Sequence, residues 1–69
     1  MDAQLIRKAR EVAGESQAAF AARFGVDQST VHRWETDGPP DRGPAKMALV
    51  REIEVIMANR AAGEGEGAS

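Results

Sequence analysis

Residues that end a helix recur at short intervals in the first part of this chain. Gly14, Gly25 and the Asp-Gly-Pro-Pro run at residues 37–40 interrupt it, and neither glycine nor proline suits the interior of a helix. The segments between these breaks carry apolar residues at helical spacing. Each segment also follows a residue suited to capping a helix, namely Asp2, Ser16 and Asp27. We therefore predict three short helices, at residues 3–13, 17–24 and 28–36.

A fourth helix is predicted after the proline-containing loop. Pro44 suits the first turn of a helix, and the segment that follows extends to about Arg60 with apolar residues along one face. These residues are Leu49, Val50, Ile53, Ile56 and Met57. Residues 63–69 are rich in glycine and glutamate and have nothing to bury, which predicts a flexible tail. No segment has the pattern of a strand, so we expect a compact all-α domain over residues 1–62.

Composition limits what such a domain can do. The chain has 69 residues, no cysteine and a formal net charge of -2. One domain is therefore expected, with no disulfide or thiolate metal site. There is no apolar run suited to a membrane and no signal-peptide pattern, so a cytoplasmic protein is expected. The charge argues against a histone-like, non-specific partner of nucleic acid, but not against a protein that reads DNA sequence.

The predicted helix at residues 28–36 has two distinct faces. Val31 and Trp34 are three residues apart and define the side that faces the core. The opposite side carries hydrogen-bonding groups and no carboxylate at its centre: Gln28, Ser29, His32, Arg33 and Thr36. A glutamine can make a paired contact with adenine, and an arginine can do so with guanine. This face therefore fits the major groove of DNA, although a merely solvated face would have the same pattern.

Residues 17–35 resemble the helix-turn-helix of the lambda-repressor-like, Cro-type family. The matching positions are Gln17, which opens a helix, the small Ala21, the turn glycine Gly25, the anchors Val31 and Trp34, and Glu35. The resemblance extends over roughly residues 5–56. It implies a domain of four helices, to which family members often add a fifth.

The resemblance also implies which residues meet double-stranded DNA. Gln28, Ser29 and Arg33 occupy the positions that read bases, and His32 is either a further base or phosphate contact or an ordinary exposed histidine. In the family, the glutamine at the position of Gln17 also holds the first reading residue in place, which here is Gln28. The expected phosphate contacts are Gln17, Thr30, Thr36, Arg42 and Lys46. For Arg42 and Lys46 an ordinary solvated charge is the alternative.

Two further features follow from the resemblance and from the need for specificity. Family members join the positions of Arg10 and Glu35 by a partly buried salt bridge, which here would fix the tilt of the reading helix. A single reading helix covers only a few base pairs, so a homodimer is expected. The fourth helix is the candidate for the dimer contact. Val55 would lie near Ala48 and Ala58, and Ile56, Met57 and the segment to Ala62 would contribute.

The sequence thus predicts a transcriptional regulator, a Cro-like repressor that occupies a palindromic operator, here in the promoter of its own operon. The alternative is a protein-binding module of the same fold, such as an antitoxin with a protein partner. Ser29, His32 and Glu35 suggest a catalytic triad, but they project in different directions from one helix, so no catalytic residue and no enzyme is expected. A lone histidine without cysteine predicts no metal, and no cofactor is expected.

Overall fold

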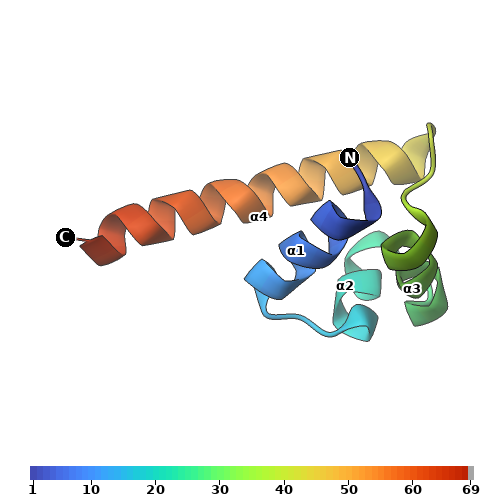
Figure 1. Cartoon of the computed structure of the whole chain (residues 1–69), viewed down its shortest axis with the longest axis horizontal. Coiled ribbons are helices and arrows are strands. Elements are labelled where there is room, and N and C mark those ends of the chain that lie inside the picture. Colours follow the sequence, from blue (N-terminus) through green and yellow to red (C-terminus); the bar gives the residue numbers. More distant parts are fainter. Residues whose placement is uncertain (69) are drawn as a thin grey trace.

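The computed structural model of this protein describes residues 1–68, with side chains as far as Arg60. It contains four α-helices: α1 (Ala3–Ala13), α2 (Gln17–Phe24), α3 (Gln28–Asp37) and α4 (Pro44–Ala68). Over residues 1–68 there is no strand. In Figure 1, α1, α2 and α3 are grouped on one side of the longer α4. The prediction of an all-α domain with four helices is confirmed.

The predicted bounds of the first two helices are confirmed, and α3 is one residue longer than predicted. The predicted end of the fourth helix near Arg60 is wrong, because α4 continues to Ala68. No proline follows Pro44 to end the helix outright, and the two alanines after Arg60 favour a helix. The predicted flexible tail at residues 63–69 lies outside the part of the chain for which side chains are described.

Two of the three predicted caps form. The Asp2 carboxylate accepts from the backbone N–H of Leu5 at 2.9 Å, and the Ser16 hydroxyl accepts from that of Ala19 at 3.0 Å. Asp27 occupies the N-cap position of α3, but its side chain makes no capping hydrogen bond. Its own carbonyl instead accepts from the N–H of Thr30 at 3.0 Å. The N–H of Thr30, to which a capping carboxylate of Asp27 would bond, therefore already has an acceptor.

Gly25 makes the tight connection between α2 and α3. Its φ is 65° and its ψ is 31°, a left-handed conformation that glycine adopts without the steric cost paid by other residues. Val26 follows, and its N–H donates to the carbonyl of Ala21 at 3.2 Å. This turn sets the direction in which α3 leaves α2.

The core fixes the orientation of α3. Val31 is completely buried, and Trp34 is 6 % exposed. Phe24 of α2 packs edge-on against Trp34, with ring centroids 5.6 Å apart. Ala21 is 2 % exposed, so a small residue lies where the two helices approach. The rest of the buried core comes from α1, α2 and α4: Ile6, Ala9, Phe20, Leu49, Ile53 and Ile56.

An ion-pair network that the sequence analysis did not predict joins α2 to α4. The guanidinium of Arg23 donates two hydrogen bonds of 2.8 Å to Glu15 and a third, also 2.8 Å, to Glu52. Its hydrogen bonds lower the pKa of the Glu15 carboxyl, and bonding to Glu15 raises the pKa of Arg23. All three side chains remain between 24 % and 31 % exposed, so we expect only a modest contribution to stability.

Candidate nucleic-acid interface

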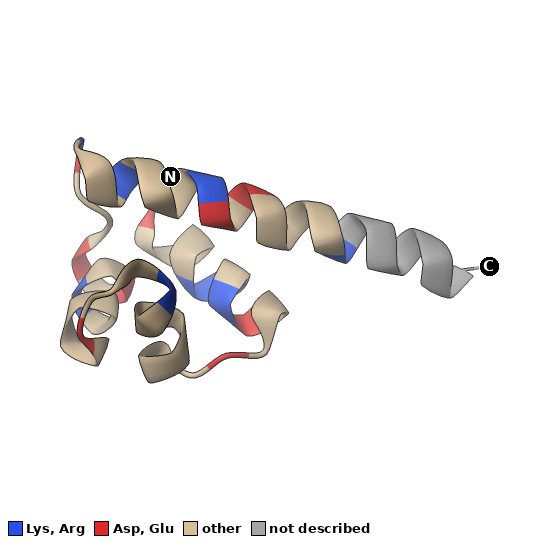
Figure 2. Ribbon diagram, turned by 180° about the vertical axis from the view of Figure 1, so that it is seen from behind, with Lys and Arg blue, Asp and Glu red and all other residues tan. Residues whose placement is uncertain are grey.

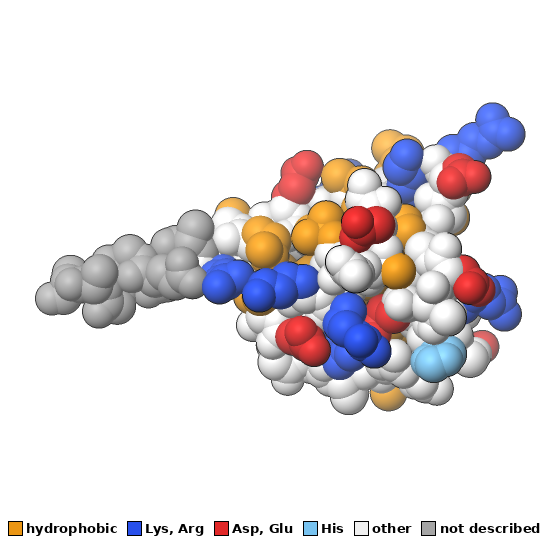
Figure 3. Space-filling view, in the orientation of Figure 1, with side chains coloured by type: hydrophobic (Ala, Val, Ile, Leu, Met, Phe, Trp, Pro, Cys, Tyr) orange, Lys and Arg blue, Asp and Glu red, His pale blue; other side chains and the backbone are white. Residues whose placement is uncertain are grey.

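The side of α3 that faces away from the core is open to solvent. All four predicted reading residues are exposed there: Gln28, Ser29, His32 and Arg33. Val31 and Trp34 occupy the opposite side, in the core. The single histidine is visible at the surface in Figure 3. The structure therefore groups these four side chains on one accessible helical face.

The charge on this face is small. Arg33 is its one permanent cation, and the exposed carboxylates of Asp27 and Asp37 lie at the two ends of the helix. Figure 2 shows acidic and basic residues interspersed over α1 to α3. A partner would therefore be held here by directed hydrogen bonds more than by a general field of positive charge.

The side chain of Gln28 is held by a relay of hydrogen bonds. Its Nε2 donates to Oε1 of Gln17 at 2.5 Å, and Nε2 of Gln17 donates to Oε1 of Glu35 at 3.1 Å. Gln28 stays exposed while Gln17 is partly buried. The exposed amide of Gln28 is therefore oriented by Gln17 of α2, which is itself held by Glu35 of α3.

The structure brings together Arg10 and Glu35, the pair that the resemblance implies. The Nε of Arg10 lies 2.6 Å from Oε2 of Glu35, and its Nη2 lies 3.1 Å from Oε1. The Glu35 side chain is 2 % exposed and that of Arg10 is 17 % exposed. Arg10 also donates to the carbonyl of Glu15 at 2.9 Å. The hydrogen bonds of the Arg10 guanidinium thus connect α1 and the turn after it to the C-terminal part of α3.

The environment of Glu35 favours its charged form. Burial alone would raise the pKa of this carboxyl, but hydrogen bonds from Arg10 and Gln17 outweigh it and lower the pKa below its ordinary value. Arg7 adds a weaker attraction, with its Nε 3.8 Å from Oε1. The hydrogen bond to Glu35 likewise raises the pKa of Arg10. Both partners therefore remain charged near neutral pH.

A dependence of stability on pH follows. A carboxyl whose folded pKa is lowered stabilises the fold above its unfolded pKa, about 4.3, and this stabilisation is lost as pH falls through the folded pKa. We expect the urea midpoint, followed by circular dichroism, to be higher at pH 7 than at pH 3. The Glu35→Gln variant should show a smaller difference between these pH values. An equal difference in the variant and the parent would contradict this account.

The predicted phosphate contacts are not gathered in one place. Thr30 is partly buried, and the hydroxyl of Thr36 donates to the carbonyl of His32 at 2.8 Å. The amide of Gln17 is engaged by Gln28 and Glu35. Arg42 is exposed in the loop before α4. None of these positions alone forms a preformed anion site.

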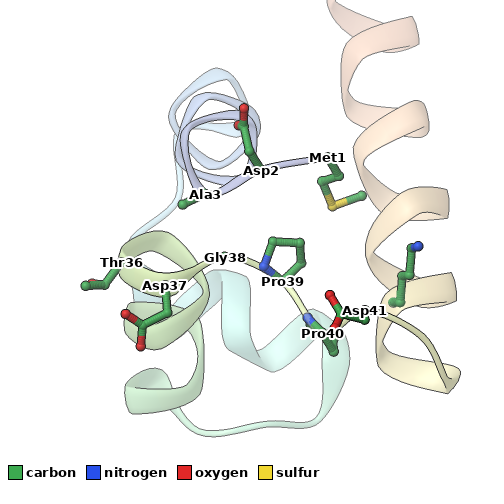
Figure 4. A pocket seen from close by; sticks show the side chains of 10 residues that line it. Met1, Asp2, Ala3, Thr36, Asp37, Gly38, Pro39, Pro40 and Asp41 are labelled. Atoms are coloured by element: carbon green, nitrogen blue, oxygen red, sulfur yellow. The ribbon is translucent and has the colours of Figure 1, made fainter.

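Lys46 and Thr36 line a hollow of about 480 Å³ between the N-terminus, the end of α3 and the following loop (Figure 4). Three carboxylates line it as well, those of Asp2, Asp37 and Asp41. A phosphate placed there would meet three like charges and one lysine. The hollow is therefore unfavourable for an anion.

The dimer residues predicted on α4 separate into two groups. Ile56 is 5 % exposed and Met57 packs against the core. Ile56 is therefore buried within one chain and is not accessible to a second copy. Met57 is only partly buried, so its contribution to a seam between copies stays a prediction. Val55 is 47 % exposed and Ala58 is exposed, while Ala48 is partly buried. Ala62 lies outside the described side chains.

Among residues 1–60 no group of three or more acidic or histidine side chains is arranged to hold a metal ion. Over the described helices none combines the length and the apolar character needed to cross a bilayer. Comparison of the chain with models of protein families, with curated proteins and with solved structures gives no match. A functional conclusion must therefore come from the geometry of α3 and the residues that support it.

Proposed function

We propose that this protein binds double-stranded DNA through the exposed face of α3 and regulates transcription as a Cro-like, lambda-repressor-like helix-turn-helix protein. In this proposal it acts as a homodimer on a palindromic operator and represses by occupying that site. The observation that carries the proposal is the relay from Arg10 through Glu35 and Gln17 to Gln28. It orients an exposed polar side chain at the start of an exposed helix.

The dimensions and chemistry of α3 support insertion into the major groove. The groove admits one α-helix, and residues near the N-terminus of that helix reach the base edges. Gln28 and Ser29 are the first two residues of α3. Gln28 presents an amide suited to adenine, and Arg33, about one and a half turns further along, presents a fork suited to guanine.

The relay gives a physical reason for specificity. A long side chain that is already ordered loses less conformational entropy when it meets a base. Glu35 is nearly inaccessible, so the support under Gln28 is part of the folded domain and not of the partner. A weakly charged α3 would gain little from non-specific attraction to phosphates, which leaves base contacts to provide discrimination.

Backbone contacts would fix the position of the domain on the duplex. The N–H groups of Gln17 and Ala18 have no acceptor within α2, as at the start of any helix. A DNA phosphate can accept from such groups. This contact would place α2 across the backbone while α3 lies in the groove.

The test begins with selection of a binding site from random double-stranded DNA. We then expect Arg33→Ala to weaken binding by roughly 1–3 kcal/mol for each half-site, which is about 5- to 150-fold for each. It should also relax base preference at one position of each half-site. Fluorescence anisotropy against the selected site and against variants of that position measures both effects.

Arg33→Lys is the matched control, because it keeps the positive charge but loses the fork that pairs with guanine. We expect the lysine variant to show a weaker base preference than the parent, because its ammonium reaches guanine without the paired geometry, while its salt dependence stays close to that of the parent. Equal affinity of the parent protein for selected and scrambled DNA at moderate salt would refute the proposed function.

A further inference from the structure

The side of α4 that faces away from α1, α2 and α3 carries an uncovered apolar strip. We call this the outer face; it consists of Met47, Val50, Arg51, Glu54, Val55 and Ala58. The prediction that Val50 shares the core-facing side of the helix is wrong, because Val50 is partly buried but does not join the core cluster. Met47 is 68 % exposed and Val55 is 47 % exposed, and among the described residues only Met1 is another large hydrophobic side chain with comparable exposure. Met47 and Val50 line a shallow apolar hollow rimmed by Lys46, Arg51 and Glu54. Figure 3 shows hydrophobic side chains between charged ones along α4.

Two opposite charges lie near the middle of the outer face. Arg51 and Glu54 are exposed, and within residues 1–60 neither takes part in a hydrogen bond or ion pair. The neighbouring Glu52 differs, since it accepts from Arg23 at 2.8 Å on another side of the helix. The outer face therefore offers one unpaired cation and one unpaired anion, three residues apart.

We propose that the outer face binds the same face of a second copy, with the two α4 helices antiparallel. The two-fold axis would run between the two α4 helices, level with the peptide bond between Glu52 and Ile53. Positions 51 and 54 are equally far from that axis on its two sides, so Arg51 comes opposite the partner's Glu54. A two-fold axis repeats this contact, which gives two ion pairs from one match.

The same axis also matches the apolar residues by size. Positions 47 and 58 are equally far from it, so the large Met47 side chain lies opposite the partner's Ala58. Large and small residues that face each other allow two helices to approach closely. A parallel arrangement would instead place Arg51 opposite the partner's Arg51, where like charges repel.

The contact is small, because each copy contributes one helix. Stable interfaces bury roughly 1,200–2,000 Å², and a single pair of short helical faces lies below that range. We therefore expect a dissociation constant between about 10 µM and 1 mM for the free protein. Adjacent half-sites would raise the effective concentration of the two copies and strengthen the pairing. This last step rests on the proposed function, whereas the association itself does not.

The test uses the full chain with charge reversals at the two central positions. Sedimentation equilibrium from 10 µM to 1 mM should show dimer formation by the parent protein. Arg51→Glu alone and Glu54→Arg alone each turn two attractive pairs into two repulsive ones. We expect each to weaken dimerisation about tenfold.

An equimolar mixture of these two variants is the decisive sample. In the mixed dimer every pair is again attractive, so the mixture should associate at least as strongly as the parent. The doubly reversed variant, Arg51→Glu with Glu54→Arg, should also dimerise like the parent. A change in folding alone cannot produce recovery on mixing, and circular dichroism of each variant checks that it is folded.

A parent protein that stays monomeric to 1 mM, or a mixture that associates no more than either variant alone, would overturn the proposed interface. Binding of both single variants to one DNA half-site is measured in parallel. If half-site binding with base preference persists while the pairing fails, this interface is lost and the reading of DNA by α3 stands. If pairing holds while base preference is absent, the interface stands and the proposed function is lost.

Discussion

Replacing Glu35 by leucine is expected to lower the free energy of unfolding by about 3 kcal/mol. The substitution leaves Arg10, whose side chain is only 17 % exposed, without its carboxylate. Loss of one partner of a buried pair costs about 3–5 kcal/mol. The lower end applies here because Arg10 keeps some contact with water and its bond to the carbonyl of Glu15. Urea denaturation of the variant and the parent at pH 7 measures the difference.

A double-mutant cycle separates the cost of a stranded charge from the value of the pair. Arg10→Met removes the main partner of the Glu35 carboxylate, which keeps the hydrogen bond from Gln17 and the weaker attraction of Arg7. We therefore expect it to destabilise the fold, by less than Glu35→Leu does. The double variant Arg10→Met with Glu35→Leu removes both charges from the site, and we expect it to be more stable than either single variant. Costs that simply add would show that the two residues do not interact as the geometry indicates.

The same double variant also tests the relay to Gln28. Gln17 loses its acceptor on Glu35, so the amide to which Gln28 donates is no longer fixed, even if the domain is stable. Under the proposed function, base preference at the position that Gln28 reads should then decrease. A stable double variant with unchanged preference would show that Gln28 does not depend on this support.

The short helices could be predicted from the sequence because their ends are determined locally. Gly14 and Gly25 both adopt the left-handed conformation expected of a residue that follows a helix. Asp2 and Ser16 form caps with residues three positions further along the chain. The burial of Val31 and Trp34 followed from their spacing on one helix. Such features depend on neighbours in the sequence and require no knowledge of how helices cross.

The remaining features depend on contacts between distant parts of the chain. The bond between Gln17 and Glu35 spans 18 positions, and that between Arg23 and Glu52 spans 29. The resemblance placed Gln17 beside Gln28 and Arg10 beside Glu35, but as two separate pairs. That Glu35 joins them depends on the angle between α2 and α3. No spacing in the sequence reports this angle.

The end of α4 and the cap of α3 were mispredicted for a different reason. In each case the residue type permits more than one outcome. Glycine weakens a helix by roughly 1 kcal/mol relative to alanine but does not forbid it. Asp27 has the right backbone for an N-cap, yet its carbonyl satisfies the donor that its carboxylate would have used. Preferences of this size are decided by the surrounding structure.

Trp34→Ala is expected to be the most destabilising substitution, with a loss of about 3–5 kcal/mol. Trp34 is 6 % exposed and contacts Phe24 edge-on, so truncation removes most of a large buried side chain and leaves a cavity between α2 and α3. A domain of this length has a total stability of roughly 3–10 kcal/mol. The variant should therefore be largely unfolded or melt far below the parent, as measured by thermal circular dichroism.

Neighbouring positions on α3 provide the control for this prediction. Trp34→Phe keeps an aromatic ring against Phe24 and should lose much less stability than the alanine variant. Arg33→Ala removes an exposed side chain and should leave the melting temperature nearly unchanged. Under the proposed function the two variants differ in DNA binding: Trp34→Phe should retain base preference, and Arg33→Ala should lose it. If Trp34→Ala melted with the parent, the core would not be what turns Gln28 and Arg33 outward, and the assignment of the two faces of α3 would be wrong.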